Sequence, residues 1–311
     1  MKHDQGVEPR LRRRVAADLP DAYRVFRRSL FDYLHRIGQV DAQTAAEPPV
    51  EEAWVRQRSW MEHLAATAAE DWVAEGPDGR IIGWAQSVER EGLLELTLFF
   101  VDPTVQSRGT GRALLERAFP RGRGSARAIV ATQDPRALGL YLGFDVQYST
   151  TSVDLLGRPS PVSVETDLVI DPVAPGYEAA AETAIVGIER ELLGHGRAED
   201  VRFLLRDRPA WLARRDGRVV GMAFGASGTD TGPIGALDPA DLPALLATVE
   251  SEAAQRGLEE IAFTIPMINA IALAHVLGRR FRIDPFYTFI LSDDDRMQLD
   301  RWVHTEPVFI L

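Results

Sequence analysis

The sequence predicts an α/β protein built from two similar halves, each with a mixed central β-sheet flanked by helices. Three observations carry this prediction. Residues 94–103 form an apolar run that stops at a proline, as a buried strand does, and glycines and a helix-type run follow. Residues 72–83 and 211–221 both read as strand, Asp-Gly turn, strand, which is a hairpin signature. They are offset by roughly 138 residues, and further matches in the same order favour a tandem duplication.

The first half opens with an expected strand at 11–15. Asp18 caps a helix that we expect to run to about Ile37, and a second helix covers about 51–69. The patterns that follow predict strands near 71–75, 81–88 and 93–101, a helix from 112, a strand at 128–132, a helix from Asp134 and a last strand near 145–155.

Residues 157–161, rich in glycine and proline, are typical of a linker. The second half then repeats the order of elements from near Val164. We therefore expect an N-terminal domain at 9–156 and a C-terminal domain at 162–311.

The composition excludes several classes of function. The 311 residues include no cysteine, which removes disulfides, thiolate nucleophiles and cysteine metal sites. The six histidines have no close ligand spacing, so we expect no metal. A net charge of −11 disfavours a nucleic-acid partner. The charged N-terminus and the lack of a long apolar run predict a cytoplasmic protein with no membrane partner.

The junction between the strand at 93–101 and the helix that follows it has the form of an anion site. The first N–H groups of a helix have no internal partner, and the macrodipole adds partial positive charge there. A pyrophosphate can bind at such a place without a metal. Gly109 can adopt a conformation that other residues resist, and Gly111 leaves room for a close approach.

This junction resembles the coenzyme A signature of the GNAT superfamily of N-acetyltransferases, written Gln/Arg-x-x-Gly-x-Gly/Ala. Residues 134–144 resemble the next motif of that family, with Asp134, Ala137, Tyr141 and Gly143-Phe144. The resemblance implies two tandem GNAT-like domains and acetyl-CoA as co-substrate. It also implies a set of residues that bind acetyl-CoA: Phe99, Val101, Gln106, Ser107, Arg108, Gly109, Thr110, Gly111, Arg112, Asp134 and Ala137.

The second half lacks this anion loop. Its counterpart strand ends near Asp238-Pro239, and no glycine precedes the next helix. Asp241 adds negative charge and Pro243 removes a donor N–H. We therefore assign coenzyme binding and catalysis to the first half, and interpret the second half as a degenerate domain.

Two residues are candidates for the chemistry of acetyl transfer. Glu95 resembles the glutamate base of the histone-acetyltransferase branch of the family, and would act directly or through water. A salt bridge or a solvent-facing role is the alternative for Glu95. Tyr141 resembles the tyrosine that protonates the departing thiolate, with a core aromatic as its alternative. Only Leu142 separates Tyr141 from Gly143-Phe144, which is fewer residues than the family usually has.

The resemblance predicts an enzyme that transfers acetyl from acetyl-CoA to the primary amine of a small molecule whose identity stays open. The segment from Phe31 to Trp60 carries aromatic residues that would serve either the core or an acceptor pocket. A non-catalytic acyl-CoA-binding module and a protein lysine or N-terminal acetyltransferase are the competing hypotheses. We also leave open a homodimer.

Overall fold

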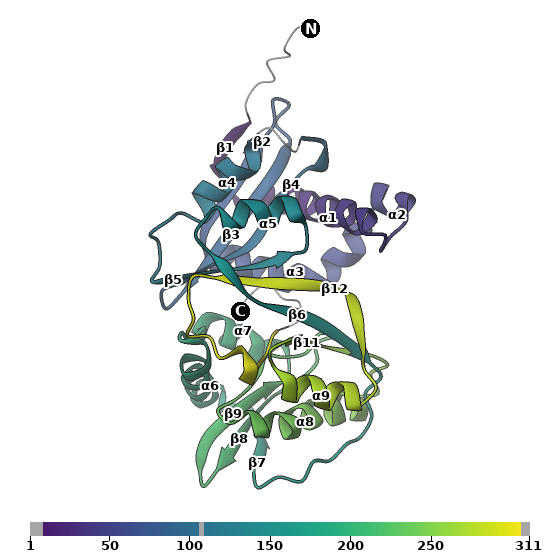
Figure 1. Ribbon diagram of the computed structural model, residues 1–311, viewed down its shortest axis with the longest axis vertical. Coiled ribbons are helices and arrows are strands. Elements are labelled where there is room, and N and C mark those ends of the chain that lie inside the picture. The colour runs from purple at the N-terminus through teal and green to yellow at the C-terminus, as the bar shows by residue number, and fades with distance from the viewer. Residues whose placement is uncertain (1–8, 106–108, 306–311) are drawn as a thin grey trace. The chain divides into compact units, whose positions relative to one another are not determined.

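The computed structural model describes residues 9–105 and 109–305 (Figure 1). The chain forms two compact units. The first comprises residues 1–89 and 94–127, and the second comprises residues 90–93 and 128–311. Each unit is considered by itself below.

The first unit holds a sheet in the order β1-β2-β3-β4, with β1 antiparallel to β2 and β2 antiparallel to β3. Its strands are β1 (Arg10–Arg13), β2 (Ala68–Glu75), β3 (Ile81–Arg90) and β4 (Leu93–Val101). Its helices are α1 (Leu19–Arg36), α2 (Ala42–Ala46), α3 (Val50–Ala66) and α4 (Thr110–Ala118), with short 3-10 turns η1 (Ala16–Asp18) and η2 (Pro103–Val105).

Helix α4 packs against this sheet because Gly83 leaves space for it. A Cβ at Gly83 in β3 would lie 2.7 Å from Cδ1 of Leu114 in α4. Leu114 and Leu115 are fully buried, whereas Arg112 and Glu116 are exposed, as expected for an amphipathic helix. The sheet therefore fixes the position of the helix that follows β4.

The second unit contains two groups of strands. One follows the order β13-β10-β9-β8-β7, and the other runs β5-β12-β6-β11. The strands are β5 (Ala126–Thr132, whose first two residues are assigned to the first unit), β6 (Gln147–Gly157), β7 (Val169–Pro172), β8 (Ala210–Arg215), β9 (Arg218–Phe224), β10 (Ile234–Ala236), β11 (Ile261–Pro266), β12 (Arg282–Ser292) and β13 (Trp302–Val303). The helices are α5 (Pro135–Leu142), α6 (Glu178–Leu193), α7 (Ala198–Asp207), α8 (Leu242–Gln255) and α9 (Ala270–Gly278), with 3-10 turns η3 (Pro239–Asp241) and η4 (Leu299–Arg301).

The two halves of the sequence exchange strands in this unit. β12 pairs with β5, β6 pairs with β11, and β6 and β12 pair with each other, all antiparallel. Figure 1 shows β6 in teal beside β12 in yellow. In the first half, β6 follows β5 and α5; in the second half, β12 follows β11 and α9. β6 pairs with β11 of the second half, and β12 pairs with β5 of the first half.

This exchange explains where the observed elements depart from the expected ones. The strand expected at 145–155 is β6, which extends to Gly157 because it pairs with β11 there. The expected linker therefore begins one residue later, and the first strand of the second half, β7, starts at Val169 rather than near Val164. The compact units cut across the domains expected at 9–156 and 162–311, which stay a prediction about the sequence repeat.

The repeated hairpins and helix starts lie where the sequence puts them. β8 and β9 are joined at Asp216-Gly217, both with positive φ, which a tight hairpin turn requires. Asp134 caps α5 by accepting from the N–H of Arg136 at 3.0 Å. At the matching position, Asn269 caps α9 by accepting from Ala272 at 3.0 Å.

Candidate active site

The N-terminus of α4 is the centre of the candidate site. Gly109 precedes the helix with φ of +81°, and a Cβ built on it would meet no atom within 4 Å. The helix begins at Thr110, two residues earlier than expected, and its first backbone bond runs from Ala113 N–H to Gly109 O at 3.1 Å. The N–H groups before Ala113 have no helical partner. The predicted ligands Gln106, Ser107 and Arg108 lie outside the described residues.

Asp102 fixes the turn η2 that follows β4. Its side chain is fully buried and accepts from Thr104 N–H at 3.0 Å, Thr104 Oγ1 at 2.6 Å and Arg28 Nη1 at 2.6 Å. Burial raises the pKa of Asp102, but the hydrogen bonds from Thr104 and Arg28 outweigh it and lower the pKa. The carboxylate is therefore ionised and holds the turn that leads toward α4.

Helix α1 packs against the end of β4 through neighbouring residues. Ser29 Oγ donates to the carbonyl oxygen of Val101 at 2.6 Å. The ring of Phe26 lies 4.6 Å from the ring of Phe100, centre to centre. With the Arg28–Asp102 pair, these contacts fix the position of Phe100, Val101 and Asp102.

Glu95 lies in the middle of β4 and is 1% exposed. It shares a strand face with Thr97, Phe99 and Val101 because side chains alternate. Thr97 Oγ1 donates to the carbonyl oxygen of Gln86 at 3.2 Å, and Phe99 is half-buried. The alternative of a solvent-facing glutamate is therefore wrong, since Glu95 is enclosed.

Tyr141, Asp134 and Ala137 lie in the second unit on or beside α5. Asp134 is bound by Arg136, with Nη2 to Oδ2 at 2.8 Å, and Ala137 is half-buried in the first turn. Tyr141 is 5% exposed, and burial, with a contribution from the Asp134 charge, raises its pKa above its usual range. The phenol is therefore neutral at physiological pH.

Helix α5 ends early, as the short spacing before Gly143-Phe144 indicates. Its last residue is Leu142, and Phe144 N–H donates to the carbonyl oxygen of Tyr141 at 2.8 Å. The candidate residues thus form two groups. Glu95, Phe99, Val101 and the described motif residues Gly109–Arg112 belong to the first unit, and Asp134, Ala137 and Tyr141 belong to the second.

Two carboxylates lie at the corresponding helix start in the second half, Asp238 before the turn η3 and Asp241 at the N-cap of α8. Asp238 accepts from the N–H of Ala240 at 2.9 Å. Asp241, 5% exposed, lies at the N-cap of α8 and is bound by Arg215 at 2.7 Å. A second pyrophosphate here would have to displace or repel these groups.

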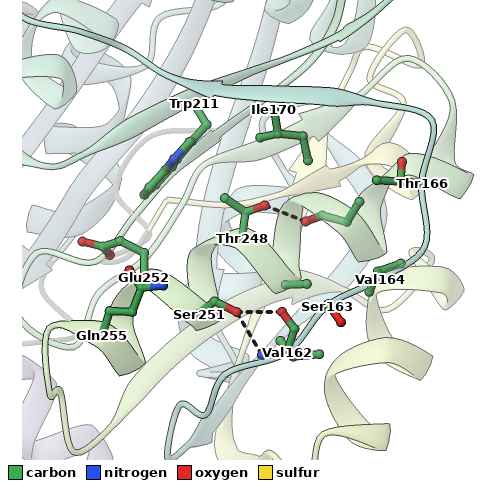
Figure 2. Close-up of a pocket in the computed structure, with 12 residues that line it drawn as sticks. Val162, Ser163, Val164, Thr166, Ile170, Trp211, Thr248, Ser251, Glu252 and Gln255 are labelled. Atoms are coloured by element: carbon green, nitrogen blue, oxygen red, sulfur yellow. Dashed lines mark hydrogen bonds between the residues drawn. The ribbon is translucent and has the colours of Figure 1, made fainter.

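The second unit also has a groove of about 380 Å³ between α8 and the segment at 162–166 (Figure 2). Trp211 and Ile170 form an apolar wall. The hydroxyl of Ser251 already has protein partners, since its Oγ donates to Val162 O at 2.8 Å and accepts from Val162 N–H at 3.0 Å. Glu252 contributes the only charged side chain of the lining, and it is negative. This groove does not suit a pyrophosphate.

Residues 9–105 and 109–305 contain no group of three or more histidine, aspartate or glutamate side chains that could hold a metal ion. No helix in these ranges has the length and apolar character needed to cross a membrane.

Sequence reasoning missed the role of α1. The apolar pattern of this helix indicates core packing and gives no role to Arg27, Arg28 and Ser29. A signal was nevertheless present, because Tyr23, Arg27 and Phe31 lie four residues apart on one helix row. An arginine in an otherwise aromatic row of a helix indicates that its charged group interacts with a polar or charged partner.

The comparisons with known proteins agree with this geometry. Residues 32–144 match the profile of the acetyltransferase (GNAT) family. A candidate acetyltransferase from Pyrococcus horikoshii has a TM-score of 0.69 at 17% identity, over 97% of this chain and 95% of that one. A GCN5-related N-acetyltransferase from Sphaerobacter thermophilus has 0.62 at 16%, over 92% and 95%. No curated protein matches the sequence.

A tandem GNAT protein from the clavulanic acid biosynthesis pathway also matches, with a TM-score of 0.57 at 17% identity, over 92% of this chain and 98% of that one. At such identities the likeness shows the fold alone. Because the matches span both halves, they confirm the predicted α/β class and the tandem arrangement.

Proposed function

Residues 32–144 of this chain belong to the GNAT acetyltransferase family, within a tandem GNAT fold, and from this premise we propose a specific reaction. The enzyme transfers the acetyl group of acetyl-CoA to the primary amine of a small molecule, and catalysis lies in the N-terminal half. Fold alone does not give a substrate, so the proposal depends on the residues of the site.

The observation that carries the proposal is the difference between two helix starts. The start of α4 combines left-handed Gly109 with first-turn backbone N–H groups that have no helical partner, which suits a pyrophosphate. At the start of α8, Asp238 accepts from the preceding turn η3 and the negative Asp241 lies at the N-cap. This contrast supports one acetyl-CoA site for each chain.

The reaction needs a free amine, a polarised carbonyl and a protonated leaving group. The amine nitrogen bonds to the carbonyl carbon of acetyl-CoA, the carbon–sulfur bond breaks, and the electron pair leaves on sulfur. The amine loses one proton and the thiolate gains one, so the products are an amide and coenzyme A. The backbone at Phe99 and Val101 would polarise the carbonyl.

Glu95 and Tyr141 would handle the two protons. Glu95 is enclosed in β4 on the strand face that it shares with Phe99 and Val101, which supports Glu95 as the base, directly or through water, while a structural salt bridge is its alternative. The raised pKa of Tyr141 keeps its phenol protonated, which a general acid requires. The competing acyl-CoA-binding module would need neither residue, and a protein acetyltransferase would use them on a lysine or an N-terminus.

The test is a turnover screen with acetyl-CoA over primary amines, followed by release of free thiol. The chain contains no cysteine, so a thiol reagent sees only coenzyme A. We expect amine-dependent thiol release that Gly109→Asp abolishes. Thiol release from peptides but from no small amine would favour the protein acetyltransferase. Tight acetyl-CoA binding without release for any amine or peptide would favour the binding module.

A further inference from the structure

Arg27 is a buried cation for which the described part of the chain supplies no counter-ion. Its residue exposure is 7%, and its Nε is buried and bonds to nothing. Within residues 9–105 and 109–305, its guanidinium makes no hydrogen bond and no ion pair. A buried charge normally has a partner because the loss of hydration is costly.

Three other buried arginines of the same chain follow this rule. Arg90 is 4% exposed and forms a two-point pair with Asp200, at 2.6 and 3.0 Å. Arg197 is 1% exposed and binds Glu189 at 2.7 Å. Arg208 binds Asp207 at 3.0 Å. Arg27 therefore departs from the way this chain treats its buried guanidinium groups.

The surroundings of Arg27 compensate its charge only in part. The guanidinium carbon lies 4.7 Å from the ring centre of Phe31 and 5.8 Å from that of Phe26. Such contacts contribute on the order of 1–2 kcal/mol when they are desolvated, less than the cost of burying the charge.

Among the described residues, the groups that act on the Arg27 charge are Tyr23 and Arg56, and neither is a carboxylate. Tyr23 donates its hydroxyl to Gln57 Oε1 at 2.8 Å. Arg56, already paired with Glu52 at 2.9 Å, repels the Arg27 charge. Burial is the main effect and lowers the pKa of Arg27, Tyr23 acts in the opposite direction, and Arg56 lowers it further. An anionic ligand would reverse this imbalance.

Arg27 also lies next to the residues of α1 that hold the end of β4. Phe26, Arg28 and Ser29 contact Phe100, Asp102 and Val101 respectively. The backbone of this strand end is where the proposed reaction would hold the acetyl carbonyl. A group bound by Arg27 would therefore be held on the helix that packs against that strand end.

We infer that Arg27 binds a carboxylate of the acceptor, so that the acceptor is an amino-acid-type compound with both an amine and a carboxylate. This inference rests on the proposed function. A guanidinium and a carboxylate match in charge and in two-point geometry. One uncompensated positive charge suits a single negative charge better than a phosphate, which carries nearly two at neutral pH.

The first experiment compares L-amino acids with their carboxamides as acceptors for acetyl-CoA. We expect kcat/KM to favour the acid over its amide by about 10- to 100-fold, the range for a hydrogen bond to a charged group. Arg27→Met should bring this ratio to about 1 and leave the rate with the amide nearly unchanged. Arg27→Lys should keep part of the preference. Arg24→Met, which changes an exposed arginine of the same helix, should leave the ratio intact.

The second experiment needs no turnover. The melting temperature is measured with each acid and each amide, with and without coenzyme A. We expect acids to raise the melting temperature of the parent protein more than amides do, and Arg27→Met to remove this difference. Without ligand, Arg27→Met should melt at the same or a higher temperature, because an unpaired buried charge has been removed.

Equal effects of acids and amides on the parent protein would overturn the inference, as would an acid preference that persists in Arg27→Met. Selective binding of acids with no acetyl transfer would instead contradict the proposed function and leave the carboxylate site standing.

Discussion

At the scale of the residue, Tyr141 is a buried phenol whose pKa is raised. We predict that Tyr141→Phe lowers kcat by about 10²- to 10⁴-fold, the usual contribution of general acid–base catalysis. The ring and its packing remain, so the affinity for acetyl-CoA and the melting temperature should change little. Steady-state kinetics and calorimetry check this together. Parental turnover in the variant would mean that Tyr141 is a core aromatic.

Glu95 gives a prediction about pH. Glu95→Gln keeps the size of the side chain and removes the proposed base, so the rate at neutral pH should fall by at least tenfold. High pH should restore part of the rate, because free amine then forms without help. The measurement is a pH–rate profile of kcat/KM for both proteins. Two profiles of the same shape and height would contradict the role of Glu95.

The residue types of the site were predictable only in part. Gly109 and Tyr141 carry local signals, a glycine before a helix and a tyrosine before Gly-Phe. The sequence pattern places Asp102 at the end of a strand, but it does not predict the hydrogen bonds of Asp102 to Thr104 and Arg28. Arg28 lies 74 positions away in the chain, and a single sequence does not encode such a contact in its local pattern.

At the scale of the element, the strand exchange gives a sharp test at Gly157. This residue ends β6, and a Cβ there would lie 2.6 Å from the ring of Phe281. Phe281 is 4% exposed and packs 5.6 Å from the ring of Phe263, so it has little room to move. We predict that Gly157→Ala costs about 1–3 kcal/mol of unfolding free energy.

Gly139→Ala is the matched control for this prediction. Gly139 lies within α5, and a Cβ there would meet no atom within 4 Å. Alanine favours a helix over glycine by up to about 1 kcal/mol, so this variant should be more stable than the parent. Urea unfolding of both variants provides the comparison. If both have the parental midpoint, the packing of Gly157 against Phe281 is wrong.

The elements themselves were largely predictable, and their partners were not. Apolar alternation and caps gave most helices and strands, including the repeated hairpins. The exchange of β6 and β12 was missed because a strand has two edges and its pattern does not say which strand pairs with either. The sequence repeat instead predicts a separate sheet in each half, with the division at residues 157–161.

At the scale of the whole molecule, two buried histidines predict acid sensitivity. Burial lowers the pKa of His195 to about 4, with Arg197 contributing, and lowers that of His304 to about 3. Both values lie below the 6.5 of an unfolded chain, so the unfolded state takes up protons first. The contribution of these two histidines to the free energy of unfolding is therefore fully present above pH 6.5 and is lost as the pH drops toward 4.

The loss from one such histidine is about 2 kcal/mol at pH 5. His195→Asn should flatten the fall in melting temperature between pH 6.5 and 4, whatever its effect at neutral pH. The exposed His35 serves as a control, and His35→Asn should keep the parental slope. An unchanged slope in His195→Asn would show that His195 is not protonated on unfolding.

We propose that the N-terminal half binds acetyl-CoA and that the C-terminal half does not. Titration calorimetry of the full chain with acetyl-CoA tests it most directly. We predict one site for each chain. Gly109→Asp should remove binding, because it places a carboxylate at the start of α4. Ala240→Asp makes the matched change at an exposed position before α8 and should leave binding unchanged. Two sites for each chain, or loss of binding in Ala240→Asp alone, would contradict the account.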